Sequence, residues 1–152
     1  MILQELTLQN FRSFKKKSFE FSSGLTVIVG PNTIGKTNIL EAVYLLATGK
    51  SFRAEEEKEI ISYGEEITRV GGVILSPDVH RDEGSLANAS LEIVLTTGLV
   101  GGQVAPHKKF LVNGVAKRMI DFLGNLRAVL FWPEDLELIT DSPSVRRKYL
   151  DL

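Results

Sequence analysis

Residues 30–38 read GPNTIGKTN and lie between two apolar segments, LTVIV at residues 25–29 and ILEAVYLLATG at residues 39–49. The first segment is a short continuous apolar run, which is typical of a central strand buried on both faces. The second repeats its apolar residues at the 3.6-residue spacing of an α-helix. The quoted stretch is therefore predicted to be a loop that connects a buried strand to an amphipathic helix.

The loop fits the pattern G-x-x-x-x-G-K-[ST], with Gly30, Gly35, Lys36 and Thr37 at its defined positions. In such a loop, backbone N–H groups surround a phosphate, and the helix N-terminus adds unpaired donors and its dipole. Lys36 is expected to reach the β- and γ-phosphates, and the Thr37 hydroxyl to coordinate Mg²⁺. A random chain of this length carries the pattern roughly once in two hundred cases. The sequence therefore predicts binding of ATP with Mg²⁺.

The pattern of apolar residues and turn signals predicts the other elements. The helix after the loop is expected over residues 36–47, and Gly49 is expected to end it in a left-handed conformation. Asn113 and Gly114 are predicted to form a tight hairpin turn. Strands are expected at residues 2–8, 18–21, 70–75, 90–96 and 108–112, with a buried strand at 127–132. Short helices are expected at 120–123, within 133–139 and from 143, and solvated connections at 76–88 and 98–106.

Composition limits the functional classes. The chain has 152 residues, 43% of them apolar and 24% charged, which is normal for one globular domain. It has no cysteine, which excludes disulfides and thiolate chemistry, and its two histidines are too few for a histidine metal site. No window approaches 18 apolar residues, and the N-terminus lacks the apolar core of a signal peptide. A soluble cytoplasmic protein that makes no membrane contact is expected.

Charge is distributed unevenly although the formal net charge is only −1. A strongly basic body that would bind nucleic acid by bulk charge is therefore excluded, and any DNA contact must be local. Basic residues cluster at Arg12, Lys15, Lys16 and Lys17 and again at Arg146, Arg147 and Lys148, whereas Glu55, Glu56, Glu57 and Glu59 follow the first helix.

Two blocks of sequence resemble a known family. LTLQNFRSFKKKSFEFSSGLTVIVGPNTIGKTNILEAVYLLATGKSFR resembles the opening of the ABC-type ATPases of the SMC, Rad50 and RecF group. RAVLFWPEDLELITDSPSVRRKYLDL resembles the RecF family in particular, in which a strand leads into F-x-P-E-D-L and then R-R-x-[FY]-L-D. The resemblance implies an α/β fold, namely a P-loop NTPase of the ABC-type ATPase head class, with a mixed sheet, β-hairpins and a P-loop helix.

The resemblance also implies a function. RecF proteins are slow, DNA-stimulated ATPases whose heads form a homodimer around bound ATP and Mg²⁺. They bind DNA at gaps or at junctions of single and double strands, and act with RecO and RecR to load RecA in recombinational repair. These properties imply roles in DNA repair, DNA replication and the SOS response to DNA damage, in the cytoplasm.

Carried over residue by residue, the resemblance implies a nucleotide site and several further contacts. The residues that match the family's loop are Gly30, Asn32, Gly35, Lys36, Thr37 and Asn38. Arg12 matches an arginine that lies near the phosphates in this group, and the alternative is a solvated basic loop with residues 15–17. Lys50 and Arg53 match a segment that approaches phosphate or DNA, and the alternative is surface pairing with the nearby glutamates.

The second block supplies further candidates. Glu134 and Asp135 occupy a turn at which related SMC heads carry a glutamine that holds Mg²⁺ and the attacking water, and the alternative is a helix N-terminal cap. Arg146 and Arg147 match the R-R-x element and are expected to face DNA or water. The aromatic pair at 131–132 is expected in the core rather than as a base-stacking platform.

Two elements of a complete ABC head are missing from the sequence. No L-S-x-G-Q signature occurs, and no apolar strand leads directly into Asp-Glu as a Walker B strand does. In RecF both lie further along the chain, so residues 1–152 are expected to be the N-terminal part of one head, with weak ATP binding and negligible hydrolysis. The alternatives are another SMC- or Rad50-like head, a small complete P-loop kinase or GTPase, or a folded lobe that binds no nucleotide alone.

Overall fold

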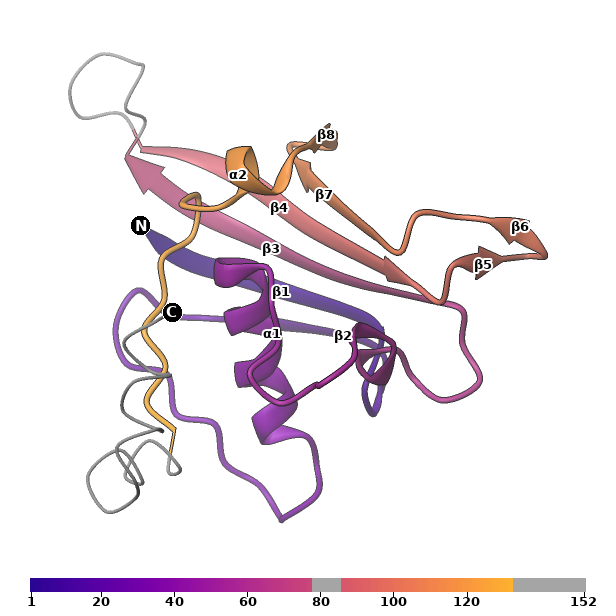
Figure 1. Cartoon of the computed structure of the whole chain (residues 1–152). Helices are drawn as coiled ribbons and strands as arrows, with labels where there is room; N and C mark the ends of the chain where they lie inside the picture. Colours follow the sequence, from indigo (N-terminus) through magenta and orange to yellow (C-terminus); the bar gives the residue numbers. More distant parts are fainter. Residues whose placement is uncertain (78–85, 133–152) are drawn as a thin grey trace, which may run out of the picture.

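A computed structural model describes residues 1–77 and 86–132. These residues form a six-stranded sheet in the order β2-β1-β3-β4-β7-β8, in which every neighbouring pair is antiparallel, and a separate two-stranded hairpin, β5-β6 (Figure 1). The strands are β1 (Ile2–Phe11), β2 (Phe14–Glu20), β3 (Ile67–Pro77), β4 (Leu86–Thr96), β5 (Leu99–Val100), β6 (Gln103–Val104), β7 (Lys108–Val112) and β8 (Val115–Lys117). The helices are α1 (Lys36–Thr48), the 3-10 helix η1 (Glu57–Ile60) and α2 (Met119–Phe122).

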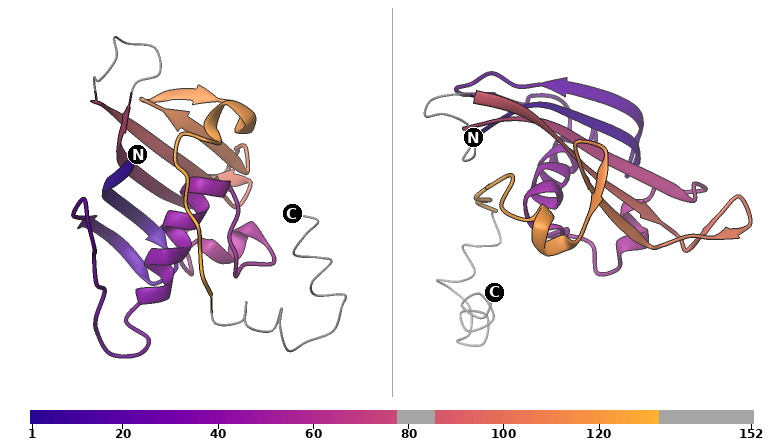
Figure 2. Two further views of the ribbon diagram at one scale, coloured as in Figure 1. Left: turned by 90° about the vertical axis from the view of Figure 1, so that its left-hand side faces the viewer. Right: turned by 90° about the horizontal axis from the view of Figure 1, so that it is seen from above.

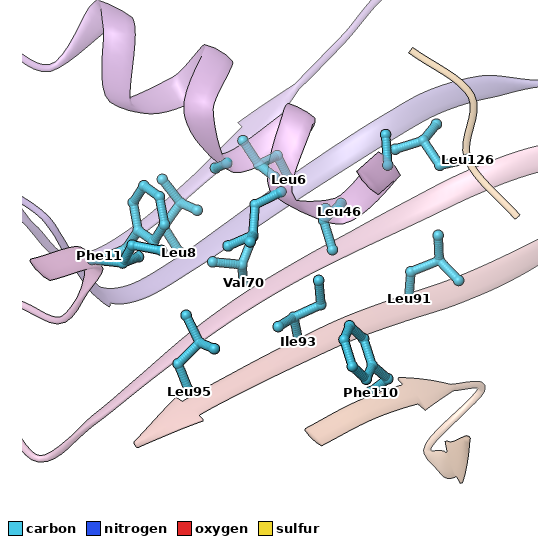
Figure 3. Packing of buried hydrophobic residues seen from close by; sticks show 14 of the residues in the cluster. Leu6, Leu8, Phe11, Leu46, Val70, Leu91, Ile93, Leu95, Phe110 and Leu126 are labelled. Carbon is cyan, nitrogen blue, oxygen red and sulfur yellow. The ribbon is translucent and has the colours of Figure 1, made fainter. Parts of the chain in front are cut away.

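Helices α1 and α2 lie on one face of the sheet, and no helix covers the other face in the described part of the chain (Figure 2). Side chains alternate accordingly along the strands, so that Leu6 and Leu8 of β1 are buried whereas Thr7 between them is exposed. An antiparallel sheet with one packed face and one solvated face is expected to show this period of two. Figure 3 shows the resulting core, to which Leu46 of α1, Val70 of β3 and Ile93 of β4 all belong.

The predicted helix and its end are confirmed. Helix α1 begins at Lys36, directly after the loop, and ends at Thr48. Gly49 follows in the left-handed conformation with φ 72°, and its N–H donates to the carbonyl of Leu45 at 2.8 Å. Among the described residues, no helix is sufficiently long and apolar to cross a membrane.

Most of the predicted strands are confirmed, with changes at their ends. Strand β2 begins at Phe14, four residues earlier than predicted, so that the basic residues 15–17 lie on a strand rather than in a loop. The turn between β1 and β2 is therefore only Arg12 and Ser13. The predicted hairpin turn is present, because Asn113 and Gly114 both have positive φ (51° and 75°) and join β7 to β8. The region 98–106 contains the short β5-β6 hairpin, which extends beyond the main sheet (Figure 1).

Two predictions of buried strands are wrong. Residues 25–29 form no strand, and Leu25, Val27 and Val29 are 86%, 68% and 82% exposed. Residues 127–132 form no strand either, and Val129 is 99% exposed. An apolar run becomes a buried strand only when neighbouring strands satisfy its backbone on both sides. Within residues 1–77 and 86–132, the two runs have no such neighbour.

Candidate phosphate-binding site

Lys36, the first residue of α1, reaches back across the loop that precedes it. Its Nζ donates to the carbonyl oxygens of Gly30 and Pro31, both at 2.7 Å. An ammonium group has three N–H donors, so one donor is left for an anion. The loop is exposed, except that Gly35 at its end is buried. The lysine is therefore held over the opening of the loop by the loop's own backbone.

Gly35 connects the loop to the β1-β2 turn. Its φ is 103°, in the region that favours glycine, and a Cβ atom placed on it would lie 2.7 Å from Cζ of Phe14 and 3.2 Å from Oγ of Ser13. Only glycine meets both the backbone conformation and the close approach. The end of the phosphate loop is therefore packed against Ser13 and Phe14, which follow β1 closely in the chain.

Thr33 also has an unusual backbone conformation. Its φ is 71°, which is uncommon for any residue with a Cβ and a clear outlier for a β-branched one. Its hydroxyl donates to the carbonyl of Asn32 at 2.5 Å, a bond within the exposed part of the loop. Local strain of this kind is often found at ligand-binding loops.

The first turn of α1 is bonded to two other segments. Asn38 donates through Nδ2 to Ser13 Oγ at 3.1 Å, and accepts at Oδ1 from Nη1 of Arg53 at 3.0 Å. Thr37 lies beside it and is half-buried. The predicted loop residues and Arg53 are thus brought together at one helix end. Lys50 has an exposed side chain at the opposite end of the same helix.

Arg12 lies against the second turn of α1. Its Nε and Nη2 donate to the two carboxylate oxygens of Glu41 at 3.0 and 2.6 Å, and its Nη1 donates to the carbonyl of Glu59 at 2.8 Å. Its side chain is 20% exposed, so it does not extend freely into solvent with residues 15–17. The structure places it beside the phosphate-loop helix.

Glu41 is the residue at this site that the sequence patterns did not single out. Its side chain is fully buried, and Ser51 Oγ donates to it at 2.5 Å while Nη1 of Arg53 lies 3.8 Å away. A signal was available, because Leu45 lies one helical turn later on the buried face. An acidic residue at a core-facing helix position requires a partner.

Arg53 therefore pairs with Asn38 and Glu41 rather than with the surface glutamates at 55–59. Of those glutamates, Glu57 pairs with Lys108 and Glu56 with Lys58. The predicted alternative of a surface ion pair with the nearby glutamates does not describe Arg53 in this structure.

The remaining candidates are placed differently. Glu134, Asp135, Arg146 and Arg147 lie outside the described residues. Phe131 was expected in the core, but this was wrong: it is 76% exposed. Trp132 is half-buried, and its ring lies 4.9 Å from that of Phe52, which also contacts Tyr44 of α1 at 5.5 Å.

Comparison with known proteins agrees with this architecture. The AAA domain family matches residues 5–105. The chain is 40% identical over 152 residues to the DNA replication and repair protein RecF of Limosilactobacillus fermentum, covering 100% of this chain and 37% of the relative. It is 39% identical over 153 residues to RecF of Streptococcus pneumoniae, covering 100% of this chain and 38% of the relative. The chain thus spans somewhat more than a third of the length of these relatives.

Solved structures show the same fold. A structure of the recombination mediator protein RecF with ATP, in the RecFOR pathway, matches with a TM-score of 0.80 and 37% identity, covering 98% of this chain and 36% of that one. A chain from a study of ATP-driven dimerization and DNA-stimulated activation of SMC ATPases matches with a TM-score of 0.74 and 23% identity. The match covers 98% of this chain and 97% of that one. The predicted α/β ATPase-head fold and the predicted RecF resemblance are therefore confirmed. This chain belongs to the AAA domain family, and its similarity to RecF proteins extends along its whole length.

Proposed function

We propose that this chain provides the ATP-binding surface of a RecF-like DNA repair protein. The observation that carries the proposal is the loop at residues 30–35, which directly precedes α1. Lys36, the first residue of α1, donates to the carbonyl oxygens of Gly30 and Pro31 in this loop and has one N–H donor left. The solved RecF relative with bound ATP supports it.

The residues fit a Mg²⁺-bound triphosphate. The unpaired N–H groups at the start of α1 and the Lys36 ammonium supply donors and positive charge for phosphate oxygens. Mg²⁺ usually takes only one or two protein oxygens and completes its shell with water and phosphate, so the Thr37 hydroxyl suffices as the protein ligand. Bound Mg²⁺ would neutralise charge on the β- and γ-phosphates. The packing of Gly35 against Phe14 fixes where the loop ends and the helix begins.

Calorimetric titration with ATP and Mg²⁺ tests the proposal. A hydrogen bond to a charged group contributes about 1.5–3 kcal/mol, so Lys36→Ala is expected to weaken ATP binding by about 10- to 100-fold. Lys109→Ala is the matched control, because Lys109 is an exposed lysine that pairs with Val94 on the sheet, away from the loop. ATP must also raise the melting temperature of the wild-type chain. Equal ATP affinity in the Lys36→Ala variant would contradict the proposal.

The proposal extends to ATP-dependent homodimerisation and to DNA at gaps or at junctions of single and double strands. The solved SMC ATPase structure, from a study of ATP-driven dimerization and DNA-stimulated activation, supports the proposed homodimerisation. Three consecutive exposed lysines, Lys15, Lys16 and Lys17, on the edge strand β2 support the proposed DNA contact. Two copies joined around nucleotide would bring two such strands to one DNA molecule.

Salt dependence tests the DNA contact. Each phosphate contact contributes about 0.9 to the slope of log affinity against log salt for duplex DNA. If all three lysines contact phosphate, Lys15→Gln, Lys16→Gln and Lys17→Gln together reduce that slope by nearly 3. Lys109→Gln with Lys117→Gln, at the other end of the sheet, is the control and leaves it unchanged. An unaltered slope in the triple variant would exclude β2 as the DNA surface.

Further partners are RecR and RecO, with loading of RecA in the cytoplasm and a part in the SOS response, as the similarity to RecF suggests. Purified RecR and RecO, immobilised and exposed to the chain with and without ATP, test the partnership directly. A small P-loop kinase or GTPase is distinguished by a nucleotide panel, in which it would transfer phosphate to an acceptor or prefer GTP.

A further inference from the structure

The carboxylate of Glu41 joins three segments of the chain that are distant in sequence. It accepts hydrogen bonds from Arg12 in the β1-β2 turn and from Ser51 in the segment after α1, and it lies 3.8 Å from Arg53. Its side chain is 0% exposed. Among the described residues, no buried side-chain nitrogen or oxygen lacks a hydrogen-bond partner, so the group is fully satisfied.

A buried carboxylate is costly to desolvate, and core packing alone does not require one at this position. An apolar side chain of similar volume often stabilises a protein more than a buried ion pair does. The bidentate Arg12–Glu41 geometry, however, fixes the plane of a guanidinium group, which an apolar residue cannot do. The carboxylate therefore determines the orientation of Arg12.

Arg12 belongs to a turn that is bonded to the phosphate end of the helix through Ser13 and Asn38. Glu41 lies four residues after Thr37, which corresponds to roughly 6 Å along the helix axis. The neighbouring Ser13 contacts both Asn38 and the position of Gly35, so the whole turn is fixed against the loop. Three of the five N–H donors of Arg12 are used, by Glu41 and the carbonyl of Glu59. Two donors on its partly exposed side chain stay free for a ligand.

We propose that Glu41 is a positioning residue for the γ-phosphate of bound ATP, acting through Arg12. This rests on the proposed function. The loop amides and Lys36 serve the phosphates nearer the nucleoside and the β–γ bridge. Arg12, which is held beside α1 beyond Thr37, supplies a second positive charge that binds the γ-phosphate. Glu41 holds the Arg12 side chain in place before the nucleotide binds. The conformational entropy of that side chain is therefore not lost on binding.

The test compares the affinities for ATP and for ADP, each with Mg²⁺, by calorimetry on the whole chain. Glu41→Gln is expected to weaken ATP binding about tenfold and ADP binding less than twofold, because only ATP carries the γ-phosphate. Arg12→Gln is expected to show the same loss. Because both residues act as one unit, the double variant loses no more than either single variant.

The matched control is Glu92→Gln. Glu92 also pairs with an arginine, Arg69, at 2.8 Å, but it lies on the helix-free face of the sheet. The ratio of ATP to ADP affinity is expected to be unchanged in this variant. A ratio that falls in Glu92→Gln as much as in Glu41→Gln would overturn the proposal.

A purely structural role gives a different result. It would lower the affinities for ATP and ADP equally in Glu41→Gln, or give additive losses in the double variant, and either outcome overturns the inference. If circular dichroism shows that Glu41→Gln does not fold, the double variant, which contains no unpaired Arg12, takes its place. The ratio of ATP to ADP affinity is then compared between the double variant and Arg12→Gln, and unequal ratios overturn the inference. Failure of the wild-type chain to bind either nucleotide would instead overturn the proposed function itself.

Discussion

A Cβ atom on Gly35 would lie 2.7 Å from Cζ of Phe14, so these two residues are packed as closely as the absence of a side chain permits. One residue ends the phosphate loop and the other begins β2, and 20 residues of chain separate them. This contact packs the end of the loop against the β1-β2 hairpin.

Gly35→Ala is expected to destabilise the chain by about 2–4 kcal/mol. A left-handed residue with a side chain costs roughly 1–2 kcal/mol, and the clash with Phe14 adds about as much. Chemical denaturation measures the loss, and Gly24→Ala is the control, because nothing lies within 4 Å of a Cβ at that position. Phe14→Leu added to Gly35→Ala should recover only the part due to the clash. Wild-type stability in Gly35→Ala would contradict the described loop geometry.

Thr33→Gly is expected to stabilise the chain. Thr33 has φ 71°, and glycine removes a strain of roughly 1–2 kcal/mol at the cost of greater freedom in the unfolded chain. The net effect is a rise in melting temperature of a few degrees. Calorimetry measures it, with Thr26→Gly in the same exposed segment as the control that should give no gain. A lower melting temperature for Thr33→Gly than for Thr26→Gly would count against the left-handed conformation.

The loop and its helix could be predicted from the sequence because their signals are local. Gly35 before the helix and Gly49 after it both have positive φ, and each determines the conformation of one or two residues. The Asn113–Gly114 hairpin was predictable for the same reason.

The wrong predictions concern pairing, which a local pattern does not contain. Residues 25–29 have the composition of a central strand, but a strand needs neighbours that satisfy its backbone, and the described residues supply none. The Arg12–Glu41 pair was missed because the two residues are 29 positions apart. Only the position of Glu41 on the buried side of α1 indicated that it needed a partner.

The exposed apolar runs should cause self-association. Val27 and Val129 are 68% and 99% exposed, and contiguous apolar surface promotes association. Light scattering at increasing concentration is expected to show particles larger than a monomer, and Val27→Glu with Val129→Glu should reduce them. Val104→Glu on the β5-β6 hairpin, where Val104 is 90% exposed, is the control and should have less effect. Monomeric wild-type protein across the concentration range would contradict this expectation.

The start of α2 should be sensitive to acid. The Arg118 guanidinium, which donates to the Asp121 carboxylate at 2.9 Å, lowers the pKa of that carboxyl below its usual value. A carboxyl whose pKa is lowered on folding adds stability above its unfolded pKa, and that stability is lost as the pH falls through the folded value. An NMR titration of Asp121 measures the pKa, which Arg118→Gln should return towards the usual value. An Asp121 pKa at or above its usual value in the wild-type chain would exclude the ion pair.

The most direct test of the phosphate site is an NMR titration of the labelled chain with ATP and Mg²⁺. The backbone amides of Gly30 and residues 32–37 are expected to shift most, because their N–H groups face the bound phosphates, and the Nε–H of Arg12 should shift with them. The exposed groove on the opposite face of the sheet, lined by residues such as Thr7, Gly71 and Glu92, should remain unchanged. Shifts confined to that groove, or no shifts in the loop at saturating ATP, would contradict the assignment of residues 30–37 as the nucleotide site.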